Sequence, residues 1–470
     1  MTELWRLGAK DLAAKIAARE VSSAEVVEAH LDRIALVNPK VNAVVRVLSE
    51  DARASARKAD EAVTSGLPLG PLHGVPFTVK ENIDVGGLPT TLGVPSLAQA
   101  IAPLDAPVVQ RMRDAGGVLI ARTNLPDMAL RSDTASTLYG HTSNPWNSAR
   151  TAGGSSGGEA VALATGMTPI GLGNDIGGSL RNPANACGIA SIKPSAGRVP
   201  DAGFIPSEDR LLAVQLFNAQ GPMARRVADV RLGLEILIGA HPRDPWSIDA
   251  PLLGRPLGGR IRVAVASSPL GDEVDTPIID AVRRAAAALS DAGYDVVEAT
   301  PPRYVEAEEV WARILMGDFA PGLDDLIPLM GPEGAAFLGG LYRSIQPVNS
   351  VAEMSQLFVQ RDSIARAWSA FMVDHPLVLT PTWTRLPFKV GFDTASDESV
   401  RATRTLIRPQ MPANLLGLPS ACVPAGFDSE SGLPIGVLIT GRRFREDICL
   451  DAAEAIETRL PLVTPIDPKF

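Results

Sequence analysis

Two glycine–serine turns stand out between Thr151 and Pro194, in the segment TAGGSSGGEAVALATGMTPIGLGNDIGGSLRNPANACGIASIKP. The first turn, GGSSGG, contains Ser155 and Ser156, and the second, IGGS, ends at Ser179. Glycine lets the backbone turn sharply and approach a ligand closely. Consecutive N–H groups in such a turn can converge on an anion. A serine placed there has its hydroxyl beside backbone donors, which suits nucleophilic attack on a carbonyl group.

A GGSSGG string taken alone is more often a plain turn or a flexible linker. Gly153-x-Ser155-x-Gly157 matches the nucleophile elbow of α/β-hydrolases, which needs a strand directly before it and a downstream histidine. The preceding residues, NPWNSARTA, are typical of a loop, and the available histidines, His241 and His375, lie in loop-like segments with proline. The elbow is therefore not favoured.

The elements that must position these turns alternate between strand and helix. Apolar runs predict strands at 75–80, 118–123 and 168–175, with helices between them. This alternation predicts an α/β fold with a central mixed β-sheet covered on both faces by helices. Lys80 lies at the end of the first strand, where the pattern alone indicates no more than a solvated lysine.

A single domain is predicted over 1–470. From about 301 the alternation is lost, and helices and loops follow. The apolar residues of the region 301–375 either line a pocket for a hydrophobic substrate or simply pack their helices. They are Trp311, Leu315, Met316, Phe319 and Phe337. The predicted divisions are a helical region 1–64, a catalytic core 65–300 with the block 151–194, a helical insert 301–375 lining the pocket, and 376–470 as the C-terminal part of the core.

Several long motifs resemble those of the amidase signature family. GVPFTVKENI matches its lysine segment, and GGSSGG, GNDIGGSLR and CGIASIKPS match its signature block. ANLLGLPSACVPAGF and GLPIGVLITGRRFRED match its C-terminal pattern. The resemblance covers nearly the whole chain apart from 301–375, and it implies the amidase signature fold and the hydrolysis of carboxylic acid amides.

The resemblance also implies a Ser-cis-Ser-Lys triad. Ser179 falls on the nucleophile, Ser155 on the bridging serine after a cis Gly154–Ser155 bond, and Lys80 on the base. The implied oxyanion hole is the backbone of Ile176, Gly177, Gly178 and Ser179. The implied supporting residues are Ser156, Asp175 and Arg181.

The implied chemistry makes physical sense only if the lysine is neutral. A serine hydroxyl is a poor nucleophile until a base takes its proton. Lysine has a reference pKa of about 10.4, which burial can lower by up to about 3–5 units. Three positions depart from the family pattern: Glu81 stands where Asp is common, Asn174 where Thr is common, and Asp127-Met128 where Glu and an aromatic residue are common.

Composition limits the other possibilities. The chain has 470 residues, 46% of them hydrophobic, and a net charge of −9 without a basic cluster, which argues against nucleic-acid binding. No secretory leader or membrane span is predicted, so a cytoplasmic protein is expected.

Three cysteines without a CxxC pair and five scattered histidines predict no metal and no cofactor. Cys187 is interpreted as a buried apolar residue, and a homodimer is expected from base rates.

Three alternatives remain open. The bond cleaved in the small-molecule substrate could be an ester or a carbamate, because an acyl-enzyme mechanism admits all three. The same family includes the A subunit of a tRNA-dependent amidotransferase, which works only inside a complex. A binding or scaffold protein on an inactive hydrolase fold is disfavoured, because all three triad positions are intact.

Overall fold

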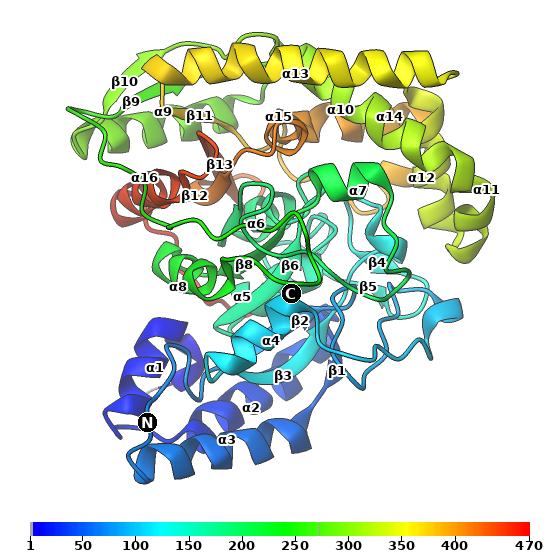
Figure 1. Cartoon of the computed structure of the whole chain (residues 1–470). Helices are drawn as coiled ribbons and strands as arrows, with labels where there is room; N and C mark the ends of the chain where they lie inside the picture. Colours follow the sequence, from blue (N-terminus) through cyan, green and yellow to red (C-terminus); the bar gives the residue numbers. More distant parts are fainter. Residues whose placement is uncertain (1–2, 272) are drawn as a thin grey trace.

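A computed structural model describes residues 3–271 and 273–470. At its centre, the described residues form an 11-stranded mixed sheet that runs through the whole molecule (Figure 1). The strand order is β1-β3-β2-β6-β8-β7-β12-β13-β11-β9-β10. The mixed α/β fold predicted from the sequence is therefore confirmed.

Most strands of the sheet are short, whereas β12 and β13 have nine residues each. Their bounds are β1 Val44–Val47, β2 Pro76–Lys80, β3 Val118–Thr123, β6 Ile170–Asn174, β7 Ala190–Lys193, β8 Gln220–Ala224, β9 Arg262–Val265, β10 Asp295–Glu298, β11 Leu377–Pro381, β12 Ser420–Asp428 and β13 Leu433–Gly441. A separate two-stranded ribbon pairs β4 Ala135–Ser136 with β5 Gly140–His141.

Helices cover both faces of the sheet because alternate strand residues point to opposite sides. In β12, Ala421 and Val423 join one hydrophobic cluster, whereas Cys422 joins the other. The first face packs against α1 Ala9–Ala17, α4 Pro107–Asp114, α8 Val227–Leu237, α9 Thr276–Asp291 and α16 Glu446–Arg459. The second packs mainly against α2 Ser23–Val41, α3 Ser49–Thr64, α5 Gly157–Ala164 and α6 Arg181–Cys187.

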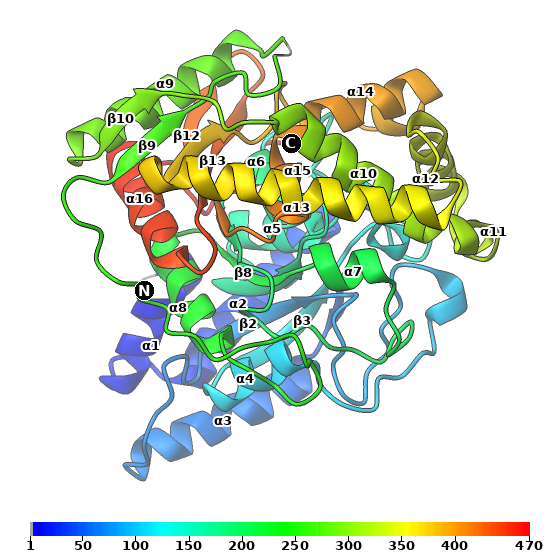
Figure 2. The ribbon, with the colours of Figure 1, turned by 45° about the horizontal axis from the view of Figure 1, so that its top comes forward.

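A third group of helices gathers beside the sheet around its own apolar cluster. In Figure 2 the long α13 crosses in front of the sheet, with α10, α12 and α14 toward the right. The bounds are α7 Leu212–Phe217, α10 Tyr304–Phe319, α11 Leu323–Leu326, α12 Pro332–Ser344, α13 Val351–Asp374, α14 Asp397–Ile407 and α15 Met411–Leu415. Short 3-10 helices lie at Leu4–Arg6, Pro95–Leu97, Asp127–Ala129, Ala320–Gly322, Ile327–Leu329, Phe392–Thr394 and Arg408–Gln410.

Two strands differ from the expectations. The first 64 residues, expected to be helical, also contain β1, which pairs antiparallel with β3 at an edge of the sheet. The strand β8 has the sequence QGPMA, whose glycine and proline hide the strand signal. It nevertheless lies between β6 and β7 and runs antiparallel to both. Within residues 3–271 and 273–470, no helix has the length and apolar character needed to cross a bilayer.

Candidate active site

Lys80 is held at the end of a fully buried strand. Its strand, β2, runs parallel to β3 and β6. Lys80 and Asn174, the last residues of β2 and β6, therefore lie together at the carboxyl ends of these strands. The Lys80 ammonium group donates to the Ser155 hydroxyl at 2.7 Å and to Asn174 Oδ1 at 2.8 Å. The solvated lysine indicated by the pattern alone is therefore wrong, because this side chain is fully buried.

Burial controls the charge of this lysine. It lowers the pKa of Lys80 to about 7, although the nearby carboxylates of Asp175 and Glu159 oppose the shift. The buried position disfavours the charged form, and no carboxylate within salt-bridge distance compensates among the described residues. Burial therefore favours the neutral form of Lys80, which can accept a proton.

The first serine turn contains glycines at which a side chain would lie too close to neighbouring backbone atoms. Gly153 has a φ of +76°, and a Cβ there would lie 2.7 Å from Pro183 Cα. A Cβ at Gly154 would lie 2.5 Å from the Arg131 carbonyl oxygen. The Gly154–Ser155 peptide bond is cis, as the family resemblance implies. The turn leads directly into α5, and Ser155, just before the start of that helix, is buried.

The second serine turn is organised by the carboxylate of Asp175. It accepts from the Gly178 N–H at 2.7 Å and from the Leu180 N–H at 3.1 Å. The Arg181 guanidinium donates to both its oxygens at 2.9 Å, and Asn414 donates to one of them, also at 2.9 Å. Burial opposes ionisation, but these partners hold the pKa of Asp175 well below its usual range.

The backbone donors of this turn are not equivalent. Of the four predicted oxyanion-hole N–H groups, that of Gly178 already donates to Asp175. Among the described residues, the N–H groups of Ile176, Gly177 and Ser179 have no protein acceptor. These three remain free to bind an anion, whereas the Gly178 N–H fixes the shape of the turn.

The two turns meet at the wall of one cavity. The Ser156 N–H donates to the Ser179 carbonyl oxygen at 3.3 Å, and Ser155 and Ser179 both line a cavity of about 590 Å³. The hydroxyls of these two serines make no direct hydrogen bond in the described structure. Of the predicted supporting residues, Asp175 and Arg181 pair directly, while the Ser156 hydroxyl is buried without a partner.

Two buried polar residues near the triad positions were missed by the sequence analysis. Glu159, in the first turn of α5, accepts hydrogen bonds from the hydroxyls of Thr78 and Thr123, the latter at 2.7 Å. Burial raises the pKa of Glu159 to about 7. Asn182 donates to Gly154 O at 3.2 Å and thereby joins the two turns. A lone glutamate in the apolar run GGEAVALA was the available signal for Glu159.

The positions that depart from the family pattern have distinct environments. Asn174 contacts Lys80 directly, as described above. Glu81 is buried and lies 3.2 Å from the Nε atom of Arg122. Asp127 accepts from the Thr137 N–H and from the Gly331 N–H, both at 2.7 Å, and so ties the pocket wall to the start of α12.

The competing nucleophiles and bases lie elsewhere. His375 caps α13 and stacks on Phe371, and His241 lies in a loop where it accepts from the Arg243 N–H at 3.2 Å. Neither histidine lines the cavity that contains Ser155 and Ser179. Burial raises the pKa of the Cys187 thiol far above neutrality, which opposes thiolate formation. The elbow and thiol interpretations therefore have no partner residues at this site.

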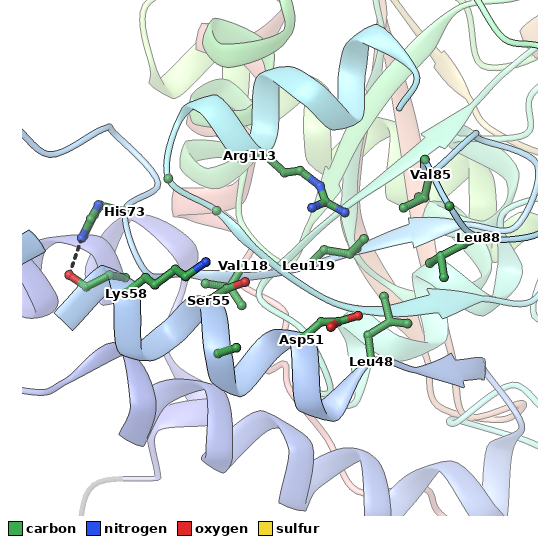
Figure 3. A pocket seen from close by; sticks show the side chains of 16 residues that line it. Leu48, Asp51, Ser55, Lys58, His73, Val85, Leu88, Arg113, Val118 and Leu119 are labelled. Atoms are coloured by element: carbon green, nitrogen blue, oxygen red, sulfur yellow. Dashed lines mark hydrogen bonds between the residues drawn. The ribbon is translucent and has the colours of Figure 1, made fainter. Parts of the chain in front are cut away.

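Two further cavities differ in what surrounds them. A small apolar chamber of about 80 Å³ adjoins Ser179 and is lined by Trp311, Phe337 and Met411. A larger cavity, about 710 Å³, lies between α3 and the β3 strand (Figure 3). There Lys58 and Arg113 line a cleft that contains none of the predicted site residues. Size alone does not identify the site, because Ser155 and Ser179 line the second largest of these three, and Lys80 reaches it only through its hydrogen bond to Ser155.

The chain is similar to known proteins along most of its length. A family model described as Amidase matches residues 25–450. An indoleacetamide hydrolase of Bradyrhizobium diazoefficiens is 42% identical over 458 residues, covering 97% of this chain and 87% of that protein. An acylamidase of Rhodococcus erythropolis is 34% identical, covering 98% and 97% of the two chains. The structure of a 6-aminohexanoate cyclic dimer hydrolase in complex with its substrate superimposes with a TM-score of 0.84 at 29% identity, covering 99% of both chains.

Proposed function

This chain belongs to the amidase family, and we propose that it hydrolyses carboxylic acid amides through an acyl-enzyme on Ser179, with Lys80 as the base and Ser155 as the proton relay. The observation that carries this proposal is the buried Lys80–Ser155 hydrogen bond of 2.7 Å at the wall of the cavity that Ser179 also lines. The pKa of Lys80 near 7 supports it, because a neutral amine can accept the proton that the nucleophile must lose.

The proposed first step is acylation. The Ser179 hydroxyl attacks the amide carbonyl carbon while its proton passes to Ser155, and the Ser155 proton passes to Lys80. The carbonyl oxygen becomes an oxyanion and binds the free N–H groups of Ile176, Gly177 and Ser179. Such preorganised donors are usually a major source of rate acceleration, and losing one costs about 2.7–4 kcal/mol in other enzymes.

The second step releases the amine and then the acid. The Lys80–Ser155 relay returns the proton to the leaving nitrogen, so that the C–N bond breaks with a neutral amine departing. Water then attacks the acyl-enzyme by the same relay and regenerates the Ser179 hydroxyl. No step requires a group beyond these side chains and water.

For the substrate we propose an amide with an apolar or aryl acyl group. The chamber next to Ser179 supports this, since its lining is largely apolar and includes Trp311, Phe337 and Met411. Much of this lining comes from the helices within 301–375, which we propose as a pocket-forming insert. The name of one relative, an indoleacetamide hydrolase, points to an aryl-bearing amide, and that of another, an acylamidase, to acyl amides in general.

The proposal is tested with the purified chain alone. We expect an arylacetamide to be hydrolysed without any partner, and matched ester and carbamate substrates then rank the three bond types. A fluorophosphonate probe should label the wild type but not Ser179→Ala. Hydrolysis only in the presence of a partner subunit would instead favour an amidotransferase subunit, and the absence of both labelling and hydrolysis would favour an inactive scaffold.

A further inference from the structure

One side chain of the helical insert contacts the second serine turn through a directed hydrogen bond. The indole N–H of Trp311, in α10, donates to the Ile176 carbonyl oxygen at 3.1 Å. The ring also lies close against the next residue, because a Cβ at Gly177 would be only 2.7 Å from the ring atom Cζ2. Trp311 is 6% exposed, so this contact is shielded from water.

This hydrogen bond fixes the direction of the neighbouring N–H group. The Ile176 carbonyl and the Gly177 N–H belong to one planar trans peptide unit, in which the two groups point in opposite directions. Holding the carbonyl oxygen toward α10 therefore directs the Gly177 N–H away from Trp311. That N–H has no protein acceptor among the described residues.

The two peptide units of the turn are thus held from different parts of the chain. The Gly178 N–H is fixed by Asp175 at 2.7 Å, which belongs to the core. The Ile176–Gly177 unit is fixed by Trp311, which belongs to the insert. The core can shape the turn, but the orientation of the Gly177 donor depends on the indole.

We propose that Trp311 is a positioning residue that orients the Gly177 N–H as an oxyanion donor. The inference rests on the proposed function, because it assumes that an oxyanion forms at Ser179. A donor that is aimed before the reaction stabilises the transition state more than the bound substrate. Loss of the indole N–H should therefore lower kcat while leaving KM nearly unchanged.

The competing interpretation is that Trp311 is only an apolar wall of the chamber beside Ser179, which it also lines. The chain offers a matched control for this. Trp368, in α13, is 2% exposed, and its indole N–H is buried without a hydrogen-bond partner in the described structure. Its ring packs 5.4 Å from that of Tyr304, away from both cavities at Ser179.

The experiment compares Trp311→Phe, Trp368→Phe and a protein with 3-benzothienylalanine at position 311. This last side chain keeps the shape of the indole but has sulfur in place of the N–H. Steady-state kinetics on an arylacetamide are combined with inhibition by the corresponding trifluoromethyl ketone, which adds serine to form a tetrahedral oxyanion.

We expect both changes at Trp311 to lower kcat about 10-fold, equivalent to about 1.4 kcal/mol, and to weaken the ketone by a similar factor. KM should stay within about twofold, and Trp368→Phe should match the wild type. If Trp311→Phe does not fold, the benzothienyl variant gives the same readout.

Two results would overturn the inference. One is wild-type kcat in the benzothienyl variant, and the other is a rise in KM with unchanged inhibition by the ketone. Ser179→Ala separates this inference from its premise. Retained turnover in Ser179→Ala would refute the proposed function itself, whereas loss there with normal kinetics at Trp311 would refute only the positioning role.

Discussion

The sheet contains two buried lysines at strand ends, and they differ in what they touch. Lys80 ends β2 and Lys193 ends β7, and burial lowers the pKa of each to about 7. Lys80 donates to a serine hydroxyl and an amide oxygen, next to the cavity. Lys193 donates to the Pro194 carbonyl oxygen at 2.9 Å and lines neither cavity beside Ser179. Burial therefore lowers the pKa in both regions, but of the two lysines only Lys80 is hydrogen-bonded to a hydroxyl that lines the cavity.

The largest expected difference between the two lysines is in turnover. Lys80→Ala should lower kcat by about 10²–10⁴-fold, the usual contribution of a general base, because the Ser155 hydroxyl then has no acceptor. Lys193→Met should stay within a few-fold of the wild type. Steady-state kinetics on one arylacetamide measure both, and equal losses in the two variants would erase the distinction.

The pH profile sharpens the comparison further. Only neutral Lys80 accepts a proton, so kcat/KM should rise as the pH passes through about 7 and level off above it, with about a tenfold loss for each pH unit below. Lys193→Met should leave this limb where it is. If the acidic limb shifted in Lys193→Met, the group that controls it would be Lys193 and not Lys80.

A smaller shift is expected from Glu159. Its negative charge raises the pKa of Lys80 against the effect of burial. Glu159 itself has a pKa of about 7, so it carries only part of this charge at the pH of the acidic limb. Glu159→Gln removes that part and should move the limb slightly to lower pH, with only a modest change in the plateau. Glu159 is not among the groups that mainly shift the pKa of Lys193. The substitution should therefore leave the titration of Lys193 unchanged. A limb moving to higher pH would contradict this assignment.

The smallest effect concerns stability. In the unfolded chain a lysine has a pKa of about 10.4, so between about pH 7 and 10 the unfolded state binds more protons and stability rises with pH. Lys193→Met removes one such contribution and should flatten this rise, raising the free energy of unfolding at pH 7 by at least about 1 kcal/mol. Urea unfolding at pH 7 and pH 9.5 measures the slope, and an unchanged slope would mean that Lys193 keeps its proton in the folded state.

The sequence predicted the fold more completely than the details of the site. Helix and strand alternation identified the mixed α/β architecture. Of the residues that the motifs singled out, Ser155 and Ser179 line one cavity, and Lys80 is hydrogen-bonded to Ser155 behind its wall. Their catalytic roles stay predictions, as do a cytoplasmic location and a homodimer. The strand β8 was missed because Gly221 and Pro222 interrupt the apolar pattern.

What sequence reasoning could not supply were contacts between distant segments. The Asn174–Lys80 contact spans two strands, and the Trp311–Ile176 contact spans two parts of the chain 135 residues apart. Trp311 was interpreted as pocket lining or ordinary packing, because periodicity shows which side of a helix is apolar but not where an indole N–H points. The engagement of the Gly178 N–H by Asp175 was likewise invisible without coordinates.

The position of β8 has a consequence for how this protein is made. β6 and β7 both belong to the block 151–194, yet they do not pair with each other, because β8 lies between them. During synthesis, a ribosome that has delivered the whole block has still not delivered the strand that joins its halves. The hydrogen bond from Arg181 to Asn414 forms later still, since Asn414 lies 233 residues further along the chain. The candidate site can therefore take its described form only after segments as distant as β8 and Asn414 have been synthesised.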